Sequence, residues 1–370
     1  MMTSYEFPPV GGGGGIAVRE LARRLADRGD KVDVVTMGYR GLPAIERSPR
    51  MTVHRVPCIR RSLRSCTVPE AASYLIGAMP TISRLRKTGE FDVVHSHFIL
   101  PDGGLGLRAA RAAGLPLVLT AHGTDVPGHN PHRVRFLHGL LKPFWRSITA
   151  EASCVVCPSG HLEALLRRSN PLAKTMVVPN GFEATRYDPT RPRTKRVLAV
   201  ARMIESKGLQ YLLEALRGFR TDYEVVLAGD GPYRPNLEKQ AAKLSVDVVF
   251  TGWLENDSEE LKNLFETSRI FVLPSSAENC PVALLEAMAA GLAIVTTGDT
   301  GCAEVVGDRA VLVPPRNAES IREALDRLAG REDRAAAMGE GARKRVERVY
   351  YWDAIVDQYR EIYESHAKAI

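Results

Sequence analysis

Short apolar runs rich in β-branched residues recur along the first half of the chain, and helical patterns separate most of them. The runs occupy residues 32–36, 52–56, 92–95, 117–120, 155–158 and 175–178. Continuous apolar runs of this length predict strands that are buried on both faces of a sheet. Residues 18–28 and 104–113 have helical spacing, and each segment is followed by a glycine that can end a helix. This alternation predicts right-handed βαβ units and a parallel sheet.

The second half repeats the pattern and predicts a second doubly wound sheet. Its apolar runs occupy residues 196–200, 224–228, 248–251, 270–273, 293–296 and 311–313. Between the halves, residues 183–195 are polar and contain Pro189 and Pro192, which disfavour a helix and suit a linker. We therefore expect an α/β protein with two Rossmann-like domains, 1–190 and 191–350, that face each other across a cleft. A last helix in 351–370 is expected to pack back on the first domain.

Composition places the chain among folded, water-soluble proteins. Of 370 residues, 45% are hydrophobic and 25% charged, values typical of globular domains. Charged residues interrupt the most apolar stretches, so no transmembrane helix is predicted. Residues 1–9 lack the basic and apolar segments of a secretion signal, which predicts a cytoplasmic protein. The first strand, before Pro8, is short enough that a start codon further upstream is an open alternative.

The formal net charge of +7 favours anionic partners such as phosphates or an acidic membrane surface. Two basic segments, residues 55–64 and 132–146, could meet anionic lipid, and the second contains Phe136, Phe144 and Trp145. The alternative is a solvated basic face with these aromatic residues in the core. A nucleic-acid partner is not expected.

Cysteine is too sparse for a disulfide scaffold, with six residues in the chain. Cys154 and Cys157 fall on one predicted strand, where a spacing of three residues points them to opposite faces. We interpret both as buried thiols and not as metal ligands.

A glycine run, Gly11 to Gly15, follows the first predicted strand and precedes a helix. Backbone amides in this context can approach a phosphate closely, here at Gly12 and Gly13. A flexible turn explains the run equally well, and the GK[ST] ending of a nucleotide-hydrolysing P-loop is missing.

Residues 275–291 form the most informative segment, a loop that enters a helix. Pro281 lies near the first position of the helix and Gly291 just past its end. Amides near Cys280 and Val282 would then meet an anion at the positive end of the helix dipole. A diphosphate suits such a site.

Two carboxylates and two cations accompany this segment. Glu278 lies in the entry loop, and Glu286 lies in the helix among apolar neighbours, where an unpaired carboxylate is costly. Carboxylates accept hydrogen bonds from the hydroxyls of sugar and ribose. Arg202 and Lys207 follow a predicted strand and could neutralise a diphosphate without a metal. No Asp-x-Asp pair that would hold a divalent cation accompanies them.

Other polar or glycine-containing turns follow predicted strands and should gather where ligands bind α/β sheets. They contain His122, Asp125, Asn180, Gly229 and Trp253. His122 could equally satisfy a hydrogen bond in the core. His95 and His97 lack the further ligands of a metal site, so we regard them as residues that support the site.

Together these motifs resemble the retaining GT-B glycosyltransferases of family four, which carry the glycosyltransferase group-one domain. The resemblance covers nearly the whole chain. It rests on Pro8-Pro9, Gly12-Gly13, Leu21-Ala22, His122 to Asp125, Asn180-Gly181, Arg202, Lys207-Gly208, and the pair Glu278 and Glu286.

The resemblance implies a role for each matching residue. Arg202 and Lys207 would bind the diphosphate of a nucleotide-sugar donor, Glu286 the ribose and Glu278 the transferred sugar. His122 would contact the sugar and stabilise the reacting centre. Further substrate-binding positions are Gly12, Gly13, Asp125, Asn180, Gly229, Trp253, Asn279, Cys280, Pro281 and Val282.

The resemblance also implies transfer to a hydroxyl acceptor with retention of configuration and without an essential metal or other cofactor. Asn279 and Cys280 replace the usual glycine and aromatic residue, which leaves the identity of the sugar open. Two alternatives share the fold, a sugar-nucleotide epimerase and a non-catalytic protein that binds sugar nucleotides. A dinucleotide-dependent oxidoreductase is disfavoured, because no acidic residue ends the strand near Thr36.

Overall fold

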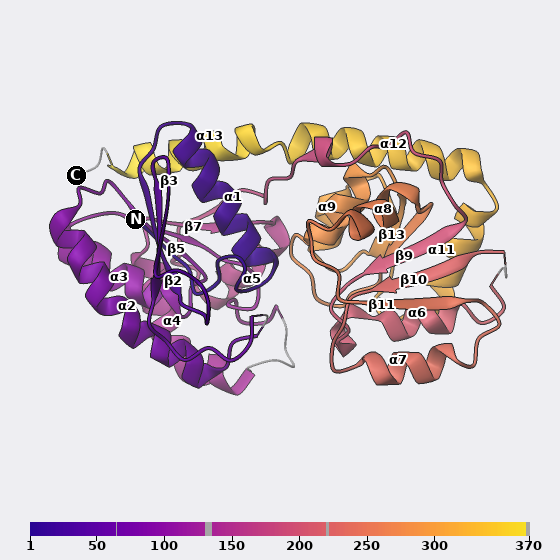
Figure 1. Ribbon diagram of the computed structural model, residues 1–370, viewed down its shortest axis with the longest axis horizontal. Helices are drawn as coiled ribbons and strands as arrows, with labels where there is room; N and C mark the ends of the chain where they lie inside the picture. Colours follow the sequence, from indigo (N-terminus) through magenta and orange to yellow (C-terminus); the bar gives the residue numbers. More distant parts are fainter. Residues whose placement is uncertain (64, 130–134, 220–221, 368–370) are drawn as a thin grey trace. The chain divides into compact units, whose positions relative to one another are not determined.

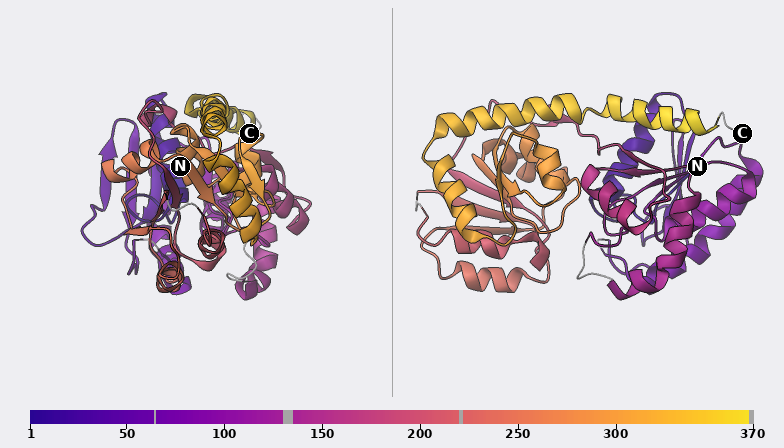
Figure 2. Two further views of the ribbon diagram at one scale, coloured as in Figure 1. Left: turned by 90° about the vertical axis from the view of Figure 1, so that its right-hand side faces the viewer. Right: turned by 180° about the vertical axis from the view of Figure 1, so that it is seen from behind.

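The computed structural model describes residues 1–63, 65–129, 135–219 and 222–367. The chain forms two compact units (Figure 1). Unit 1 comprises Met1–Asn180 and the segment from Asp353 onward, and unit 2 comprises Gly181–Trp352. Residue 190, where the sequence suggests a boundary, lies inside unit 2. Each unit is a sheet of mainly parallel strands with helices on both faces (Figure 2), which confirms the expected fold class.

The sheet of unit 1 has the strand order β3-β4-β2-β1-β5-β6-β7-β8. Neighbouring strands are parallel except for β3 and β4. The strands are β1 (Met2–Thr3), β2 (Val32–Met37), β3 (Ile45–Ser48), β4 (Met51–Val56), β5 (Val94–His97), β6 (Leu117–Thr120), β7 (Cys154–Cys157) and β8 (Thr175–Val177). β5 runs two residues beyond its predicted end at residue 95, and β3 is not predicted at all.

Helices cover both faces of this sheet. They are α1 (Gly13–Asp27), α2 (Val68–Thr88), α3 (Asp102–Ala113), α4 (Arg135–Glu151), α5 (Gly160–Ser169) and α13 (Trp352–Ala367). Tyr74 of α2, Leu105 of α3 and Ile148 of α4 share one apolar core with Leu119 of the sheet. On the other face, the hydroxyl of Tyr363 in α13 lies 2.7 Å from His95 of β5.

The sheet of unit 2 has the order β11-β10-β9-β12-β13-β14, and its strands are parallel. They are β9 (Arg196–Val200), β10 (Glu224–Ala228), β11 (Val248–Gly252), β12 (Ile270–Leu273), β13 (Ala293–Thr297) and β14 (Val311–Val313). All six were predicted, four of them with the observed bounds. The edge strand β11 and the β8 strand of unit 1 are only partly buried, so the expectation of strands buried on both faces is wrong for them.

Helices and short turns complete unit 2. They are η1 (Ala184–Arg186), η2 (Glu205–Lys207), α6 (Leu209–Ala215), α7 (Arg234–Ala241), α8 (Glu259–Thr267), α9 (Val282–Ala289), α10 (Gly301–Val306), α11 (Ala318–Ala329) and α12 (Glu332–Val349). From β9 the chain first builds the β10 and β11 side, and it then returns to build β12, β13 and β14 on the other side. The loops after β9 and β12 therefore diverge at a switch point, which is where open α/β sheets bind ligands.

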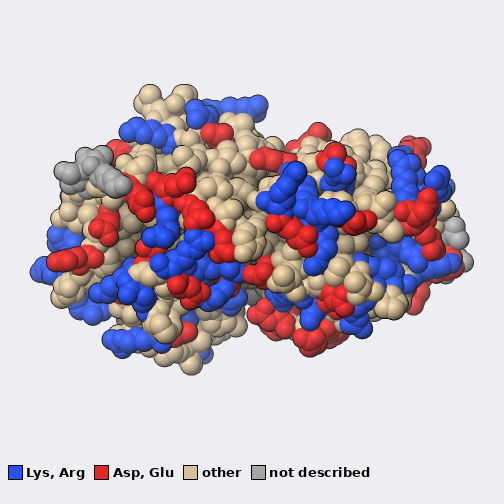
Figure 3. Space-filling view, turned by 90° about the horizontal axis from the view of Figure 1, so that it is seen from above, with Lys and Arg blue, Asp and Glu red and all other residues tan. Residues whose placement is uncertain are grey.

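The polarity of the helices and the exposure of the two basic segments are relevant to possible membrane contact. No helix within the described ranges is long and apolar enough to span a bilayer. Basic and acidic side chains are intermixed over the face shown in Figure 3. In the basic segment 55–64, Arg55 and Arg60 are buried, and Trp145 of the second segment is buried too. Arg64 and residues 132–134 lie outside the described residues, and the side chain of Phe136 is not described.

Candidate active site

The loops that follow β9 and β12 are bonded to each other at the switch point of unit 2. The hydroxyl of Ser275 and the amide of Ser276 both donate to the carbonyl oxygen of Ser206, at 3.0 and 2.9 Å. Gly208 has a φ of +72°, and a Cβ there would lie 2.1 Å from the carbonyl oxygen of Pro274. Only glycine fits both the backbone conformation and the close approach. The two loops thus hold Lys207 beside the segment that contains Glu278.

Lys207 and Glu278 form an ion pair. The Lys207 ammonium donates to Oε1 of Glu278 at 2.5 Å. The Glu278 side chain is 9% exposed and that of Lys207 is 22% exposed. Removal from water strengthens the attraction between the two charges but costs them their hydration. The loss of either partner is therefore costly, because it leaves an uncompensated buried charge. The pair brings a cation and a hydroxyl acceptor to one place in unit 2.

Glu286 is the second carboxylate of this region and lies on α9. It is 5% exposed, and the hydroxyl of Tyr187 donates to its Oε1 at 3.0 Å. Burial raises the pKa of Glu286 to about 7, against the opposing effects of the Arg186 charge and the Tyr187 hydrogen bond. Its protonation therefore changes near neutral pH.

The α9 helix begins where the sequence predicted it. Pro281 is the residue before the first turn, with extended backbone, and Gly291 follows the end with a φ of +75°. The first intrahelical bonds are donated by Leu284 and Leu285 to the carbonyl oxygen of Pro281. The amide of Val282 precedes these bonds, at the positive end of the helix dipole, where an anion is stabilised.

The segment before α9 is packed tightly against the start of α10. Asn279 and Cys280 are both 7% exposed. The amide of Gly301 donates to the carbonyl oxygen of Glu278 at 3.1 Å, and a Cβ on Gly301 would lie 1.9 Å from the carbonyl oxygen of Asn279. This packing fixes the backbone that presents Glu278.

The loops after β9, β10 and β11 are also interlocked. The amide of Met203, next to Arg202, donates to the carbonyl oxygen of Asp230 at 2.9 Å. Gly229 has a φ of +132°, a Cβ on it would lie 2.1 Å from the carbonyl oxygen of Ala201, and its amide donates to the carbonyl oxygen of Gly252. Arg202, Gly229 and Trp253 therefore lie in consecutive loops at the carboxyl edge of one sheet.

Unit 1 brings His122 together with the glycine run. The His122 and Phe98 rings have centroids 4.3 Å apart. A Cβ on Gly14 would lie 2.7 Å from Phe98 and 3.3 Å from Nδ1 of His122. Gly12 precedes the first turn of α1, Gly13 begins it, and the amide of Gly12 donates to the Glu6 carboxylate at 3.1 Å. Burial lowers the pKa of His122 to about 3, so its imidazole is neutral at pH 7.

Asp125 holds the backbone around His122. Its carboxylate accepts hydrogen bonds from the amides of Ile99, His122 and Gly123 at 2.7 to 3.0 Å. These bonds shape the loop that presents the imidazole. Asn180, another predicted substrate-binding residue, is the last residue of the first stretch of unit 1.

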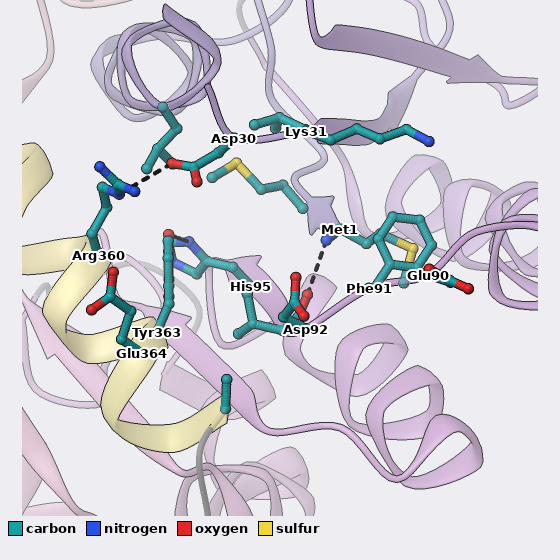
Figure 4. A pocket seen from close by; sticks show the side chains of 15 residues that line it. Met1, Asp30, Lys31, Glu90, Phe91, Asp92, His95, Arg360, Tyr363 and Glu364 are labelled. Carbon is teal, nitrogen blue, oxygen red and sulfur yellow. Dashed lines mark hydrogen bonds and ion pairs between the residues drawn. The ribbon is translucent and has the colours of Figure 1, made fainter. Parts of the chain in front are cut away.

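Metal ligands do not gather in the described part of the chain, where no group of three or more His, Cys, Asp or Glu side chains could hold an ion. Cys154 and Cys157 are buried free thiols. A cavity of about 340 Å³ in unit 1, lined by Met1, Val32 and His95, opens at the amino ends of β1, β2 and β5 (Figure 4). Because His122 follows the carboxyl end of β6, this cavity lies at the other edge of the sheet.

Known protein families match both halves of the chain. Residues 11–186 match the model described as Glycosyltransferase Family 4, and residues 183–345 match the model described as Glycosyl transferases group 1. The chain belongs to the family 4 glycosyltransferases. Two relatives match the glycosyltransferase over nearly the whole length of both chains. It is 28% identical to an alpha-maltose-1-phosphate synthase of Mycolicibacterium smegmatis, with 98% of each chain covered. It is 27% identical to an MMP alpha-(1->4)-mannosyltransferase of Mycolicibacterium hassiacum, with 98% and 97% covered.

Solved structures share the GT-B fold of the glycosyltransferase. A sucrose-phosphate synthase from Thermosynechococcus elongatus superposes with a TM-score of 0.85 at 23% identity, covering 100% of this chain and 99% of the other. HepE of Anabaena, solved in complex with UDP-glucose, gives a TM-score of 0.76 at 16% identity, with 98% of both chains covered.

Two contacts of the glycosyltransferase were not predicted. Tyr187, the partner of Glu286, lies 99 residues earlier in the chain and carries no motif. The ion pair of Lys207 and Glu278 joins two residues that sequence analysis chose separately. Burial of Glu286 among apolar neighbours was a usable signal that it would need a hydrogen-bonding partner.

Proposed function

We propose that this glycosyltransferase moves a hexose-type sugar from a nucleotide-diphosphate sugar to a hydroxyl acceptor, with retention of configuration and without an essential metal. The observation that carries the proposal is the Lys207–Glu278 ion pair of unit 2, whose carboxylate lies in the segment that leads into the first turn of α9. An ammonium and the amides of a helix's first turn suit a diphosphate. A carboxylate beside them suits a sugar hydroxyl.

The other residues take roles that the family resemblance suggests. Arg202 would bind the diphosphate with Lys207, and the Glu286 carboxylate would accept hydrogen bonds from ribose hydroxyls. His122 of unit 1 is assigned to the transferred sugar. Gly13 would approach the phosphate through its backbone, whereas the amide of Gly12 already donates to the Glu6 carboxylate.

In the proposed reaction, the bond between the anomeric carbon and the phosphate oxygen breaks, and a bond to the acceptor oxygen forms on the same face of the sugar. The acceptor's proton passes to the departing phosphate oxygen, so a nucleoside diphosphate is released. Arg202, Lys207 and the α9 amides stabilise the negative charge that develops on this oxygen. Fixed donors aimed at developing charge are commonly the largest contribution to catalysis.

The acceptor class follows from the relatives, as a proposal. Their names include an alpha-maltose-1-phosphate synthase, a mannosyltransferase and a putative teichuronic acid biosynthesis enzyme of Bacillus subtilis. We favour a glycan, a sugar phosphate or a lipid-linked sugar of cell-envelope or polysaccharide biosynthesis as acceptor. A cytoplasmic enzyme, peripheral at the inner face of the membrane, would suit the lipid-linked case.

The first test is a thermal-shift panel of nucleoside diphosphates and their sugars, with NAD and ATP as controls. A ligand that binds only the folded protein raises its melting temperature. We expect one nucleotide sugar to stabilise the wild type but not Arg202→Ala or Glu286→Ala. Stabilisation by NAD alone would overturn the proposal. Incubation of that donor with acceptors in EDTA, followed by NMR of the anomeric proton, tests metal independence and retention and separates transfer from epimerisation.

A further inference from the structure

A row of three imidazoles crosses unit 1 from α13 to the His122 loop. His95 and His97 are two residues apart on β5, so their side chains lie on the same face of the strand. Their ring centroids are 4.1 Å apart. Nδ1 of His97 lies 3.2 Å from Nε2 of His122. His95 is engaged at both nitrogens. The hydroxyl of Tyr363 lies 2.7 Å from its Nδ1 (Figure 4), and that of Thr120 lies 2.8 Å from its Nε2.

The remaining nitrogen of His97 identifies which atom carries its proton. His97 is 1% exposed, and its Nε2 has no hydrogen-bond partner among the described residues. In proteins, a buried N–H without an acceptor is rarer than a buried acceptor without a donor. The favoured arrangement therefore leaves a lone pair on Nε2 and places the hydrogen of His97 on Nδ1.

This arrangement decides the tautomer of His122. The N–H at Nδ1 of His97 points to Nε2 of His122, which must then accept the hydrogen bond. A neutral imidazole that accepts at one nitrogen carries its hydrogen on the other. His122 therefore presents an N–H at Nδ1, on the side of its ring that faces Gly14.

We propose that His97 is a positioning residue that holds His122 as the Nδ1–H tautomer, so that His122 acts as a hydrogen-bond donor to an oxygen of the bound sugar. The tautomer follows from unit 1 alone, whereas the contact with sugar rests on the proposed function. A histidine fixed in this way donates to its ligand and does not serve as the general base. This agrees with a reaction in which the departing phosphate takes the acceptor's proton.

The direct test measures nitrogen chemical shifts in the full-length protein labelled with ¹⁵N-histidine. The signals of His122 are assigned by their loss in His122→Ala. We expect a protonated Nδ1 and an unprotonated Nε2 at pH 7.5. A His122 with its hydrogen on Nε2 would overturn the proposal, whatever the activity of the protein.

Two matched variants separate positioning from packing. In His97→Asn, the amide nitrogen can replace Nδ1 as the donor, whereas His97→Leu has no donor. We expect the leucine variant to lose the fixed tautomer of His122 and about tenfold in kcat, as for the loss of one hydrogen bond, with a smaller change in KM. The asparagine variant should keep both the fixed tautomer of His122 and the wild-type kcat. An unchanged His122 tautomer in the leucine variant contradicts the proposal, and if that variant fails to fold, the asparagine variant and the wild-type spectrum still decide.

The outcomes also distinguish this inference from the proposed function. The expected tautomer in a protein that transfers no sugar would leave the positioning role intact and remove the function. Sugar transfer by a protein whose His122 carries its hydrogen on Nε2 would support the proposed function and remove the positioning role of His97.

Discussion

The ammonium of Lys207 lies 2.5 Å from Oε1 of Glu278, although the two residues are 71 positions apart in the chain. Under the proposed function, Lys207 binds the diphosphate and Glu278 binds the transferred sugar. A diphosphate would then compete with Glu278 for the ammonium, and a sugar hydroxyl that donates to Glu278 would ease this competition. The pair therefore links recognition of the two parts of a nucleotide sugar, so that the intact donor should bind better than the nucleoside diphosphate alone.

A double-mutant cycle tests the strength of this pair. Lys207→Met leaves the buried Glu278 carboxylate without its cation, so we expect a loss of about 1–3 kcal/mol in the free energy of unfolding. The double variant Lys207→Met/Glu278→Gln should recover part of this loss, because no uncompensated charge remains. Urea denaturation measures the wild type, Lys207→Met, Glu278→Gln and the double variant. Strictly additive effects would show that the two side chains do not interact.

Arg202→Ala should impair catalysis without impairing the fold. Loss of a charge-assisted contact with the developing phosphate charge is expected to cost about 2–4 kcal/mol of transition-state stabilisation, which is about 30-fold to 1,000-fold in kcat/KM. Arg334→Ala is the matched control, since Arg334 lies exposed on α12. Equal kcat/KM values for the two folded variants would remove Arg202 from the site.

Gly301→Ala should disturb the loop that presents Glu278. The new methyl group would meet the carbonyl oxygen of Asn279 at 1.9 Å, so the backbone must move. We expect a loss of about 1–3 kcal/mol in stability, as for other overpacked sites, and weaker donor binding in calorimetry. Gly298→Ala has space, with its nearest neighbour 3.8 Å away, and should behave like the wild type. Normal donor affinity in Gly301→Ala would mean that this packing does not shape the site.

Glu286 should make stability depend on pH. Its pKa is raised from 4.5 to about 7 in the folded protein, so its contribution to stability is fully present below pH 4.5 and is lost as the pH rises through 7. Glu286→Gln cannot ionise, and its amide oxygen can still accept from Tyr187. Relative to wild type, the variant should therefore gain up to about 3 kcal/mol between pH 5 and pH 8, given 1.36 kcal/mol for each pKa unit.

Denaturation of both proteins at pH 5 and pH 8 checks this prediction. If the difference in unfolding free energy between the two proteins is the same at both pH values, Glu286 does not titrate in this range.

Unit 2 was the more predictable half of the fold. Its central strands are continuous apolar runs, and four of its six strands have the predicted bounds. In unit 1, β3 was missed because all four of its residues are exposed. Without a buried face, the strand lacks the apolar pattern from which strands are predicted. The β1 strand has only two residues. Such short or exposed strands form because they pair with neighbouring strands. The local sequence does not contain information about this pairing.

The candidate site divides in a similar way. Motifs on single loops, such as the segment from Glu278 to Glu286, were recognisable because they combine a helix start with unusual polar residues. Contacts between distant segments were not, as with the hydroxyl of Tyr187 on Glu286. Asp125 was chosen for substrate binding, but its carboxylate is engaged with three backbone amides of its own unit. Residue type and spacing cannot separate a side chain that binds a ligand from one that shapes the loop beside it.

The return of α13 to unit 1 affects how the chain can be made. Tyr363 bonds His95, and Tyr359 lies 3.2 Å from the hydroxyl of Thr120. Domains generally begin to fold while the ribosome is still synthesising the chain. The first 180 residues emerge with the surface for α13 uncovered, and it stays uncovered until all of unit 2 has been translated. Unit 2 can therefore complete its core during synthesis before unit 1 does, although residues 1–180 of unit 1 precede it in the chain.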